Sequence, residues 1–392
     1  MRIAIIGGGI GGLTTALALR QFGFEPEVFE QAPDLLEVGA AILMWPNAMR
    51  VLQRLGLGET IRERGGILER ACWLNYDGRV LNNFRLPKTE LPAVVLHRAE
   101  LQRALLEPLP DESIHLGQVF ESYQQSPDKI VAHFGDQSSF AGHLLIAADG
   151  IHSQARAQLL NDGRPDDRGY LAWRGVVANP SASLTEATAF EIYGAGQRFG
   201  IGPLGRGKVG WWASTNRPVR SADALTALDE LTRLFAGWWE PVLELIRATP
   251  PTALIRNDVC DRRVVRRWGQ GSMTLLGDAI HPVTPNLGQG GCLAIEDAAV
   301  LARCLHKYAP AAGGAPEQFE RSIALALRRF AALRFARTAT VARCSRMYGV
   351  VGQWEYAPAV KLRRILLSLV PAGLSQYVLG RLFDYDAYGV SI

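Results

Sequence analysis

Three glycines near the start of the chain limit its fold more than any other feature. Gly7, Gly9 and Gly12 form the pattern Gly-x-Gly-x-x-Gly between a short apolar run, Arg2 to Ile6, and a segment with helical apolar spacing, Ile10 to Phe22. In such a unit the first glycine permits a tight turn, the second lets the backbone approach a pyrophosphate, and the third lets the helix pack closely. The helix N-terminus then faces the phosphates with the positive end of its dipole. The pattern predicts a dinucleotide-binding βαβ unit.

A second strand-like run, Pro26 to Glu30, completes this unit. Glu30 closes the strand, 18 residues after Gly12. A carboxylate at this position accepts hydrogen bonds from the adenosine ribose in dinucleotide-binding folds. The spacing therefore favours dinucleotide binding over a glycine-rich turn without a ligand.

A second motif is the apolar run Leu144 to Ala148, which ends in Asp149 and Gly150. In a parallel sheet such a carboxylate lies at the carboxyl edge, beside the cofactor crevice. Taken alone, the run is equally consistent with a strand followed by a simple turn.

The third motif, LLGDAIHPVTPNLGQGGCLAIEDA over 275–298, is the most specific. A strand ends at Asp278, a proline-rich loop follows, and the glycines of 288–291 precede a helix. Asp278 is placed to bind a ribityl hydroxyl, and the N–H groups of the glycine loop to reach the carbonyl edge of a flavin. The helix start would stabilise negative charge on the reduced ring.

The middle of the chain changes character, because Tyr170 to Thr215 contains strand-like runs separated by Gly and Pro. We expect an α/β fold: a Rossmann-like FAD-binding domain with an inserted, mostly antiparallel α+β substrate domain and a helical C-terminus. Helices are expected over 45–57, 97–107, 224–247, 291–305 and 318–346, with an amphipathic stretch over 361–383 that breaks at 371–373. The expected domains are 1–71, 98–168 and 269–345 for the cofactor, 72–97 and 169–268 for the substrate, and 346–392 as a C-terminal helical segment.

The composition excludes several other classes. The net charge is only +4, from 42 basic and 38 acidic residues in no long basic block, so we expect no nucleic-acid binding. The five cysteines and seven histidines lack the spacing of a metal site or a disulfide framework, so we expect reduced thiols and no metal. We expect a cytoplasmic location, since the N-terminus has no signal-peptide pattern, and no membrane span, since no apolar run reaches about 20 residues.

Together, GGGIGG, the Glu30 position, AADG and GDAIHPVTPNLGQGG resemble the class A flavoprotein aromatic hydroxylases. That family includes salicylate, hydroxybenzoate, hydroxynicotinate and urate hydroxylases and zeaxanthin epoxidase-like enzymes. The motifs follow the family order from Met1 to about Tyr348. The resemblance is specific for fold and cofactor and poorly specific for substrate.

The resemblance assigns cofactor contacts residue by residue. Arg98 opens the segment RAELQRALL, which is similar to the family helix whose arginine contacts the flavin nucleotide. Asp149 matches an Asp-Gly motif that the family links to both FAD and the nicotinamide cofactor. The full set implied for FAD is Gly7, Gly9, Gly12, Glu30, Arg98, Asp149, Asp278, Leu287, Gly288, Gln289 and Gly290.

Two residues are implied as catalytic. Pro285 lies in the loop that lines the oxygen-reacting face of the flavin. Arg198 lies where the urate hydroxylase-like branch has a catalytic arginine, although a salt-bridged strand arginine fits the position too. Gly210 stands where that branch has an active-site tyrosine, which argues against urate. Trp211 and Trp212 alternate, so one is expected to line the cavity and the other to pack away from it.

The implied reaction is oxygenation of an aromatic or heteroaromatic small molecule, with NADH or NADPH, O2 and a flavin hydroperoxide. The same motifs serve epoxidases of alkenes or isoprenoids and tailoring monooxygenases of polycyclic natural products. A non-catalytic flavin-binding protein is the remaining alternative, which the intact glycine loops and Pro285 disfavour. We expect a monomer or homodimer, and we expect the amphipathic C-terminal stretch to pack on its own domain rather than on a membrane.

Overall fold

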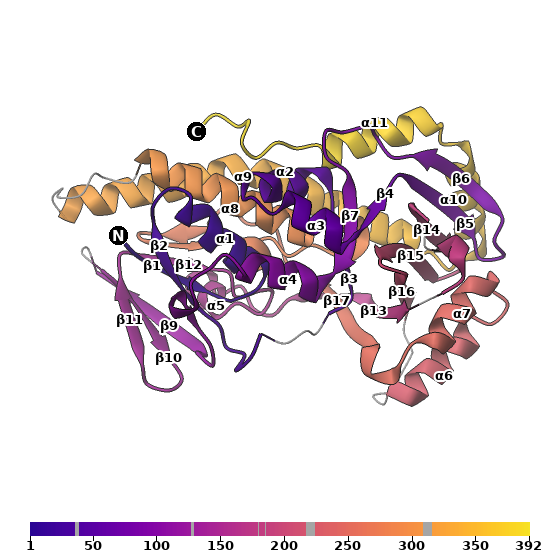
Figure 1. Ribbon diagram of the computed structural model, residues 1–392, viewed down its shortest axis with the longest axis horizontal. Helices are drawn as coiled ribbons and strands as arrows, with labels where there is room; N and C mark the ends of the chain where they lie inside the picture. The colour runs from indigo at the N-terminus through magenta and orange to yellow at the C-terminus, as the bar shows by residue number, and fades with distance from the viewer. Residues whose placement is uncertain (36–38, 127–128, 179, 185, 217–223, 309–315) are drawn as a thin grey trace.

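The computed structural model describes residues 1–392 except 36–38, 127–128, 179, 185, 217–223 and 309–315. The molecule is elongated, with a parallel sheet near the N-terminus at one end and a large, mostly antiparallel sheet at the other (Figure 1). A long helix, α9 (Pro316–Gly352), runs from the first end toward the second. The fold class expected from the sequence is confirmed.

The first sheet has six strands in the order β18–β19–β12–β1–β2–β8. They are β1 (Arg2–Ile6), β2 (Glu25–Phe29), β8 (Ile114–His115), β12 (Leu144–Ala147), β18 (Gly269–Gln270) and β19 (Met273–Leu275). Only β18 is antiparallel to its neighbour. The three predicted motifs follow β1, β12 and β19, which are adjacent and parallel, so all three meet at the carboxyl edge of the sheet.

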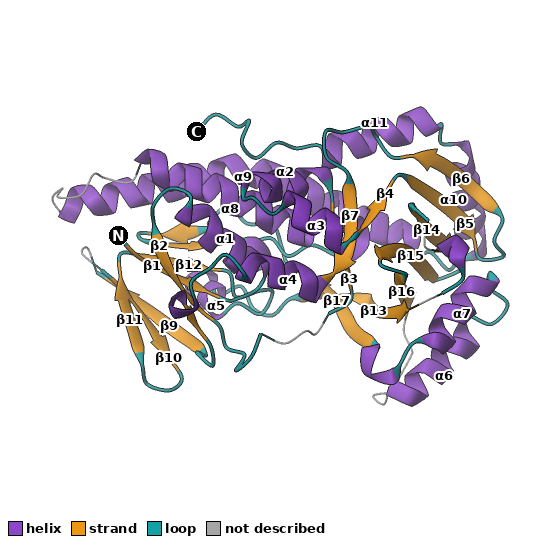
Figure 2. Ribbon diagram, viewed as in Figure 1, coloured by secondary structure: helices purple, strands orange, loops and turns teal. Residues whose placement is uncertain are grey.

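A seven-stranded sheet builds the other end of the molecule (Figure 2). Its order is β17 (Ile255–Asp261), β13 (Asp166–Ala178), β16 (Lys208–Asn216), β15 (Gln197–Gly205), β14 (Thr188–Tyr193), β5 (Arg70–Asn75) and β6 (Val80–Arg85). Every neighbouring pair is antiparallel except β14 and β5. The largely antiparallel sheet expected in the middle of the chain is thus present.

The remaining strands form two three-stranded antiparallel sheets. One contains β9 (Phe120–Gln125), β10 (Ile130–Phe134) and β11 (Ser139–Gly142), and the other contains β3 (Ala41–Met44), β7 (Ala93–His97) and β4 (Gly66–Leu68). The second of these packs against β15. A Cβ on Gly66 would lie only 2.3 Å from the carbonyl oxygen of Pro203, so the small sheet joins the nucleotide-binding lobe to the large sheet through a backbone contact that only glycine permits.

The helices depart from the expected ranges where glycine and proline intervene. The helix expected over 224–247 is two, α6 (Ala224–Leu234) and α7 (Glu240–Ala248), because Gly237 between them has a φ of +79°. The helix expected over 45–57 ends early, as α2 (Pro46–Arg54), because Gly56 has a φ of +82°. The remaining helices are α1 (Ile10–Arg20), α3 (Gly58–Arg64), α4 (Arg98–Leu106), α5 (Gln154–Leu160), α8 (Gly290–Tyr308), α10 (Ala357–Leu369) and α11 (Ala372–Phe383).

The C-terminal stretch breaks between α10 and α11, as the proline and glycine in the sequence predict. Helix α9 is longer than the expected 318–346 at both ends. The boundary expected after residue 345 therefore falls inside a helix, and we propose that the C-terminal segment begins after Gly352.

A buried cluster of charges joins α8, α9 and the loop after β19. Asp297 accepts hydrogen bonds from the Gly277 N–H at 3.1 Å and the Arg334 Nε at 2.6 Å, and it hydrogen-bonds His281 Nε2 at 2.5 Å. Arg334 also pairs with Glu296 at 2.6 Å. Burial would raise the pKa of Asp297, but the charges of His281 and Arg334 outweigh burial and hold it below its ordinary value. This cluster fixes the loop between β19 and α8.

We expect Arg334→Met to lower the free energy of unfolding by roughly 3–5 kcal/mol, because it leaves two carboxylates buried without their shared cation. Urea denaturation measures the change. Arg328→Met, at an exposed position of the same helix, is the matched control and should change stability by less than about 0.5 kcal/mol. Equal losses in both variants would show that the cluster is not what holds these helices.

Candidate active site

The glycine turn after β1 has the geometry of a phosphate cradle. Gly7 has a φ of +105°, and a Cβ on Gly12 would lie 1.9 Å from the carbonyl oxygen of Gly7. A Cβ on Gly9, by contrast, would meet nothing within 4 Å. Gly9 is the N-cap residue of α1 and offers no side-chain acceptor. The first N–H groups of α1 therefore face a space that an anionic group can approach.

Glu30 lies beside this turn. Its Oε2 accepts a hydrogen bond from the Gly8 N–H at 2.6 Å, and its Oε1 accepts one from the Ala32 N–H at 2.9 Å. Gln102 Nε2 donates to the Gly8 carbonyl at 3.1 Å. Because each carboxylate oxygen has further acceptor capacity, Glu30 can hold the turn and still accept a hydroxyl.

Asp149, at the end of β12, lies directly against the glycine turn, since a Cβ on Gly7 would be 3.2 Å from the Asp149 nitrogen. Its Oδ2 accepts the N–H of Gln154 at 2.9 Å. Its Oδ1 is buried and has no hydrogen-bond partner within the described residues. Desolvation raises the pKa of Asp149, although hydrogen bonds from Ser153 and from the start of α5 oppose the rise. A buried acceptor left unpaired is costly, so this oxygen suits a ligand donor.

The loop between β19 and α8 contributes Asp278 and a second glycine turn. Gly288 has a φ of +60°, and α8 begins two residues later at Gly290. A Cβ on Gly290 would lie 3.8 Å from Asp278 Oδ1. Asp278 is exposed, yet desolvation by the surrounding protein raises its pKa, and the charges of His281 and Arg98 offset part of the rise. Asp278 therefore lies in the wall of a recess rather than on open surface.

The starts of α1 and α8 lie side by side. A Cβ on Gly11 would be 3.1 Å from Leu276 Cδ2 and 3.3 Å from Ala294 Cβ, and a Cβ on Gly291 would be 3.9 Å from Ile10 Cδ1. The positive ends of two helix dipoles, each preceded by a glycine turn, thus converge on one recess. Such a recess suits an elongated molecule with anionic groups at two places.

The charge of Arg98 influences both Asp278 and Arg174. Arg98 is exposed at the start of α4. Arg174, on β13, donates to Asn257 Oδ1 at 2.9 Å. Desolvation, and then the charge of Arg98, lowers the pKa of Arg174. In the described part of the chain, no carboxylate forms an ion pair with Arg174.

The register of the large sheet identifies the side chains that share a face with Arg174. Arg174 pairs with Trp212, and Trp212 pairs with Gly200, so all three lie on one face. Trp173 and Trp211 lie on the other face and are fully buried in a cluster that includes residues of α6 and α7. The expected division between the two adjacent tryptophans is therefore present, with Trp212 on the same face as Arg174.

Two glycines permit close contacts on the face of the large sheet that carries Arg174. A Cβ on Gly200 would lie 1.9 Å from the Trp212 indole, so the indole covers Gly200. Trp212 also hydrogen-bonds Glu191, and desolvation raises the pKa of that carboxyl. A Cβ on Gly210 would lie 2.4 Å from Ala41 Cβ in β3, so this face packs against the nucleotide-binding lobe.

Arg198, on β15, is only 5% exposed, and its guanidinium is engaged on several sides. Its Nε donates to Ser214 Oγ at 3.2 Å and to Gln353 Oε1 at 3.1 Å. Its Nη1 pairs with Glu191 Oε1 at 3.4 Å, and its Nη2 donates to Asn286 Oδ1. The alternative of a salt-bridged strand arginine therefore describes its geometry well.

Asn286 connects Arg198 to the loop that contains Pro285. Asn286 Nδ2 donates to Tyr170 OH at 3.0 Å and to Thr284 Oγ1 at 2.8 Å, while its Oδ1 accepts from Arg198. Pro285 itself is exposed. The Arg198 network thus fixes the backbone that presents Pro285.

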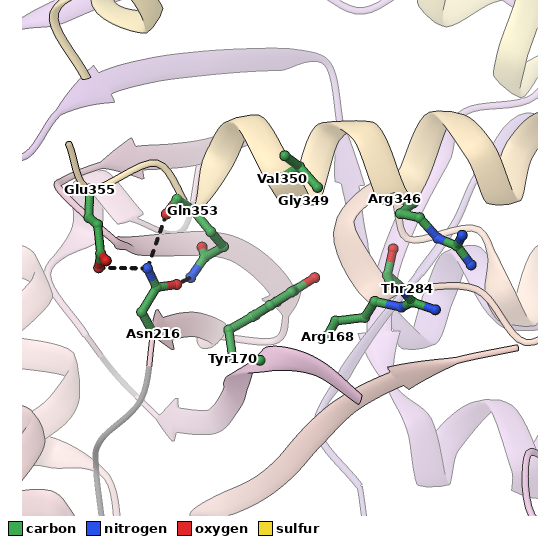
Figure 3. Close-up of a pocket in the computed structure, with 10 residues that line it drawn as sticks. Arg168, Tyr170, Asn216, Thr284, Arg346, Gly349, Val350, Gln353 and Glu355 are labelled. Atoms are coloured by element: carbon green, nitrogen blue, oxygen red, sulfur yellow. Dashed lines mark hydrogen bonds between the residues drawn. The ribbon is translucent and has the colours of Figure 1, made fainter. Parts of the chain in front are cut away.

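A polar pocket of about 390 Å³ lies beside this network (Figure 3). It is lined by Arg168, Gly169, Tyr170, Asn216, Thr284, Arg346, Gly349, Val350, Gln353 and Glu355. Asn216 Nδ2 donates to Glu355 at 2.8 Å, and Gln353 Nε2 donates to Asn216 Oδ1 at 3.0 Å. Because Tyr170 and Gln353 also contact Asn286 and Arg198, one wall of the pocket is the Arg198 network itself.

A second hollow, of about 730 Å³, lies beside α11 and ends at Trp45 and Phe383. These two rings stack with centroids 3.9 Å apart. Trp45 Nε1 donates to the Leu287 carbonyl at 3.0 Å. The C-terminal helix α11 therefore supports the second glycine turn through one aromatic side chain.

Gln289 differs from its neighbours in this turn. Its side chain is fully buried, and its Oε1 accepts from Asn47 Nδ2 at 3.0 Å. Its Nε2 has no partner among the described residues. The side chain of Gln289 therefore packs in the protein interior, and a contact with a ring at this edge would involve its backbone.

Sequence reasoning missed Arg174, Glu191 and Asn286. Arg174 lies between Trp173 and Gly175. Strict alternation along a strand places it on the face opposite to Trp173, and this pattern is the signal that could have identified it. Glu191 and Asn286 had no comparable signal, because their roles depend on contacts with distant segments. Within the described ranges, no disulfide joins any of the five cysteines, and no group of three or more His, Cys, Asp or Glu could hold a metal ion.

Comparisons with known proteins agree with this geometry. A family model described as "FAD binding domain" matches residues 1–318. The aurachin C monooxygenase/isomerase of Stigmatella aurantiaca is 38% identical over 374 residues, which cover 94% of each chain. An FAD-dependent urate hydroxylase of Klebsiella pneumoniae is 36% identical over 342 residues, covering 85% of this chain and 86% of that protein. The crystal structure of Klebsiella pneumoniae HpxO with FAD and uric acid has a TM-score of 0.88 at 31% identity, covering 98% of this chain and 96% of that one.

The chain belongs to the FAD-binding-domain family. Within that family it is a flavoprotein monooxygenase, related over nearly its whole length to enzymes named as monooxygenases and hydroxylases. The recess fits the cofactor: the Gly9 cradle and the N-terminus of α1 suit a pyrophosphate, and Asp149 offers a buried unpaired acceptor. Asp278 could bind the polyol chain of the cofactor, and the N-terminus of α8 could bind the edge of its ring.

We expect Asp278→Ala to weaken FAD binding roughly 10- to 100-fold, because a hydrogen bond to a charged group contributes about 1.5–3 kcal/mol. Fluorescence titration of the FAD-depleted protein with FAD measures the change. Glu112→Ala, which removes an exposed carboxylate from the nucleotide-binding lobe, should bind FAD like the wild type. Unchanged affinity in Asp278→Ala would exclude the carboxylate from the cofactor site.

Proposed function

We propose that this flavoprotein monooxygenase hydroxylates a planar, electron-rich aromatic or heteroaromatic small molecule that carries an ionisable oxygen. NADH or NADPH would supply the electrons and O2 the oxygen atom. Bound FAD supplies the redox chemistry and the activated oxygen. The protein residues bind and orient the ring.

The observation that supports this proposal most is the face of the large sheet that Arg174 and Trp212 share. It packs against the nucleotide-binding lobe at Gly210 and contacts the Pro285 loop through Arg198. A ring bound there would lie between a sheet and the carboxyl edge of a nucleotide-binding fold, which is where ligands bind in such folds.

The charge balance on this face favours a substrate with an anionic oxygen. Arg198 already pairs with Glu191, so its charge is compensated within the protein. Arg174 is desolvated, and no carboxylate of the described residues pairs with it. A phenolate or an enolate would compensate this cation, and such an oxygen also makes a ring more electron-rich. We therefore propose Arg174 as the substrate-binding cation.

Trp212 favours a flat substrate. Its indole covers Gly200 and is held in place by its hydrogen bond with Glu191. A fixed aromatic ring in a recess binds another planar ring by offset stacking or edge contact, worth about 0.5–1.5 kcal/mol beyond burial. Trp212 therefore favours a planar ring substrate over a long alkene.

Arg198 and Pro285 are proposed to act on the reaction in different ways. Pro285 is an exposed residue of the loop and would face the reacting ring. Arg198 would act through Asn286, as a positioning residue that holds this loop. The assignment of Arg198 as catalytic stays a prediction, as do the FAD contacts and the cytoplasmic, monomeric or homodimeric state expected from the sequence.

The second candidate function is tailoring of a polycyclic natural product, in which oxygenation is followed by rearrangement. It is favoured by the relative from Stigmatella aurantiaca, whose name joins a monooxygenase to an isomerase. The urate hydroxylase-like relatives favour simple ring hydroxylation, but Gly210 argues against urate itself.

A substrate screen tests the proposed function. The purified, FAD-loaded chain is mixed with NADH or NADPH and with phenols, hydroxyquinolines, hydroxypyridines and purines. We expect accelerated NAD(P)H oxidation and a product heavier by one oxygen for at least one ring with an acidic hydroxyl. A product with one added oxygen and a migrated substituent would favour the tailoring reaction. No acceleration with any ring compound, but acceleration with alkenes, would contradict ring hydroxylation.

We expect Arg174→Met to raise the KM of such a substrate about 10- to 100-fold, because it removes a charge-assisted hydrogen bond from a desolvated site. The loss should shrink as the pH falls below the substrate's own pKa. Steady-state kinetics across pH measures both effects. Arg256 is the matched control, since its pairing with Trp173 places it on the opposite face of the same sheet. Arg256→Met should leave KM unchanged.

We expect Arg198→Ala to keep bound FAD and to lower kcat on the order of 100-fold, since misplacing a loop by about an ångström has such an effect. The absorbance spectrum reports FAD content, and product formation reports turnover. Full product formation by this variant would remove Arg198 from the catalytic machinery.

A further inference from the structure

The C-terminal helices α10 and α11 expose an unusual set of apolar side chains. On α10 these are Leu362, Ile365, Leu366 and Leu369, which are 44–70% exposed, and on α11 they are Leu374, Tyr377 and Val378, which are 45–61% exposed. In Figure 1 both helices lie at the periphery of the molecule, next to β6, with which they make contact. Large apolar side chains concentrated on one segment indicate a surface that meets something apolar.

The amphipathic pattern of α10 is inverted. Residues 362, 365, 366 and 369 follow helical spacing, so they form one stripe, and this stripe faces solvent. The protein-facing side of the helix instead buries Arg363, which donates to the carbonyls of Gly352 at 2.6 Å and Gly194. Helix α10 therefore uses Arg363 for hydrogen bonds to internal backbone and exposes its leucines to solvent. This arrangement favours an apolar contact outside the fold.

The charged side chains of α10 and α11 all have one sign. The segment 357–383 contains no Asp or Glu, while Lys361, Arg364 and Arg381 are exposed. The acidic residues that flank it are engaged elsewhere, since Glu355 accepts a hydrogen bond from Asn216 and Asp384 pairs with Arg50. Apolar side chains among cations, on two helices without an acidic residue, match the interface of an anionic lipid bilayer.

The geometry agrees with a helix pair that lies in the interface. Within the described residues no single helix is long and apolar enough to cross a membrane, while α10 and α11 qualify as a pair by length and composition but are bent by 94° at their break. Helices that lie flat expose one apolar face each to the headgroup boundary, and both helices have such a face.

The sequence favours packing of this stretch on its own domain, and α10 and α11 do contact β6. Their exposed faces lead us further: we propose that they form a docking surface for an anionic lipid bilayer, with Leu366, Leu369 and Leu374 entering the headgroup region and Lys361, Arg364 and Arg381 contacting lipid phosphates. A second copy of the chain is a weaker occupant, because the two helices contain no acidic residue to pair with the cations of the same helices in a partner. The proposal does not depend on the substrate, since these residues lie outside the recess.

Vesicle flotation of the FAD-loaded, full-length protein tests the proposal. We expect the protein to float with vesicles of phosphatidylglycerol and phosphatidylcholine, and to float much less with phosphatidylcholine alone or in 1 M salt, where charges are screened. Leu366→Ser with Leu369→Ser should reduce binding on the order of tenfold. Lys361→Gln with Arg364→Gln should reduce it at least fivefold, since each cation near an anionic surface contributes about 1 kcal/mol.

The matched control is Leu225→Ser, which removes a leucine that is 63% exposed on α6, and it should float like the wild type. FAD content, read from absorbance, shows that each variant is folded. Because the charge pair keeps every leucine, it tests the surface even if the serine variant fails to fold. No flotation of the wild type, equal flotation of all variants, or a dimer in light scattering that the leucine variant abolishes would each overturn the proposal.

Discussion

The contacts of Asp297 hold the candidate active site together. One carboxylate, fully buried in α8, accepts hydrogen bonds from the backbone after β19 and from Arg334 of α9, and it holds His281. Through these hydrogen bonds, one side chain holds the sheet edge, the proline-rich loop and both long helices in fixed relative positions. The N-terminus of α8 is thereby aimed at the same recess as the N-terminus of α1, and the second glycine turn gains a fixed position relative to the first.

The two ends of the molecule are joined by side chains that belong to neither glycine motif. Asn286 links the loop before α8 to Arg198 in the large sheet, and Trp45 links the second glycine turn to Phe383 in α11. The recess is therefore shaped by the nucleotide-binding lobe, the inserted sheet and the C-terminal helices together. This arrangement explains how relatives with different named substrates can share one cofactor-binding frame, because the inserted sheet can change without altering the glycine turns.

Arg174 and Arg198 show how burial and partners decide what a charge can do. Both are arginines on the same face of the large sheet, and the sequence offered stronger grounds for Arg198. In the fold, Arg198 pairs with Glu191 and supports a loop, whereas Arg174 is desolvated and lacks a carboxylate partner in the described ranges. A compensated cation fixes structure, and an uncompensated one attracts a ligand anion. The same reasoning applies to the C-terminal helices, which place cations but no acidic residue among outward-facing leucines.

Local patterns of residues were enough to predict the dinucleotide-binding unit and the order of the motifs, because glycine turns after short apolar strands and carboxylates at strand ends act through local chemistry. The resemblance of these motifs to a known flavoprotein family then implied the fold class and the cofactor. Contacts between distant segments set the remaining features. The face of Trp212, the burial of the Gln289 side chain, the partners of Arg198 and the outward stripe of α10 depend on which distant segments meet, and a local pattern of residues does not specify those contacts.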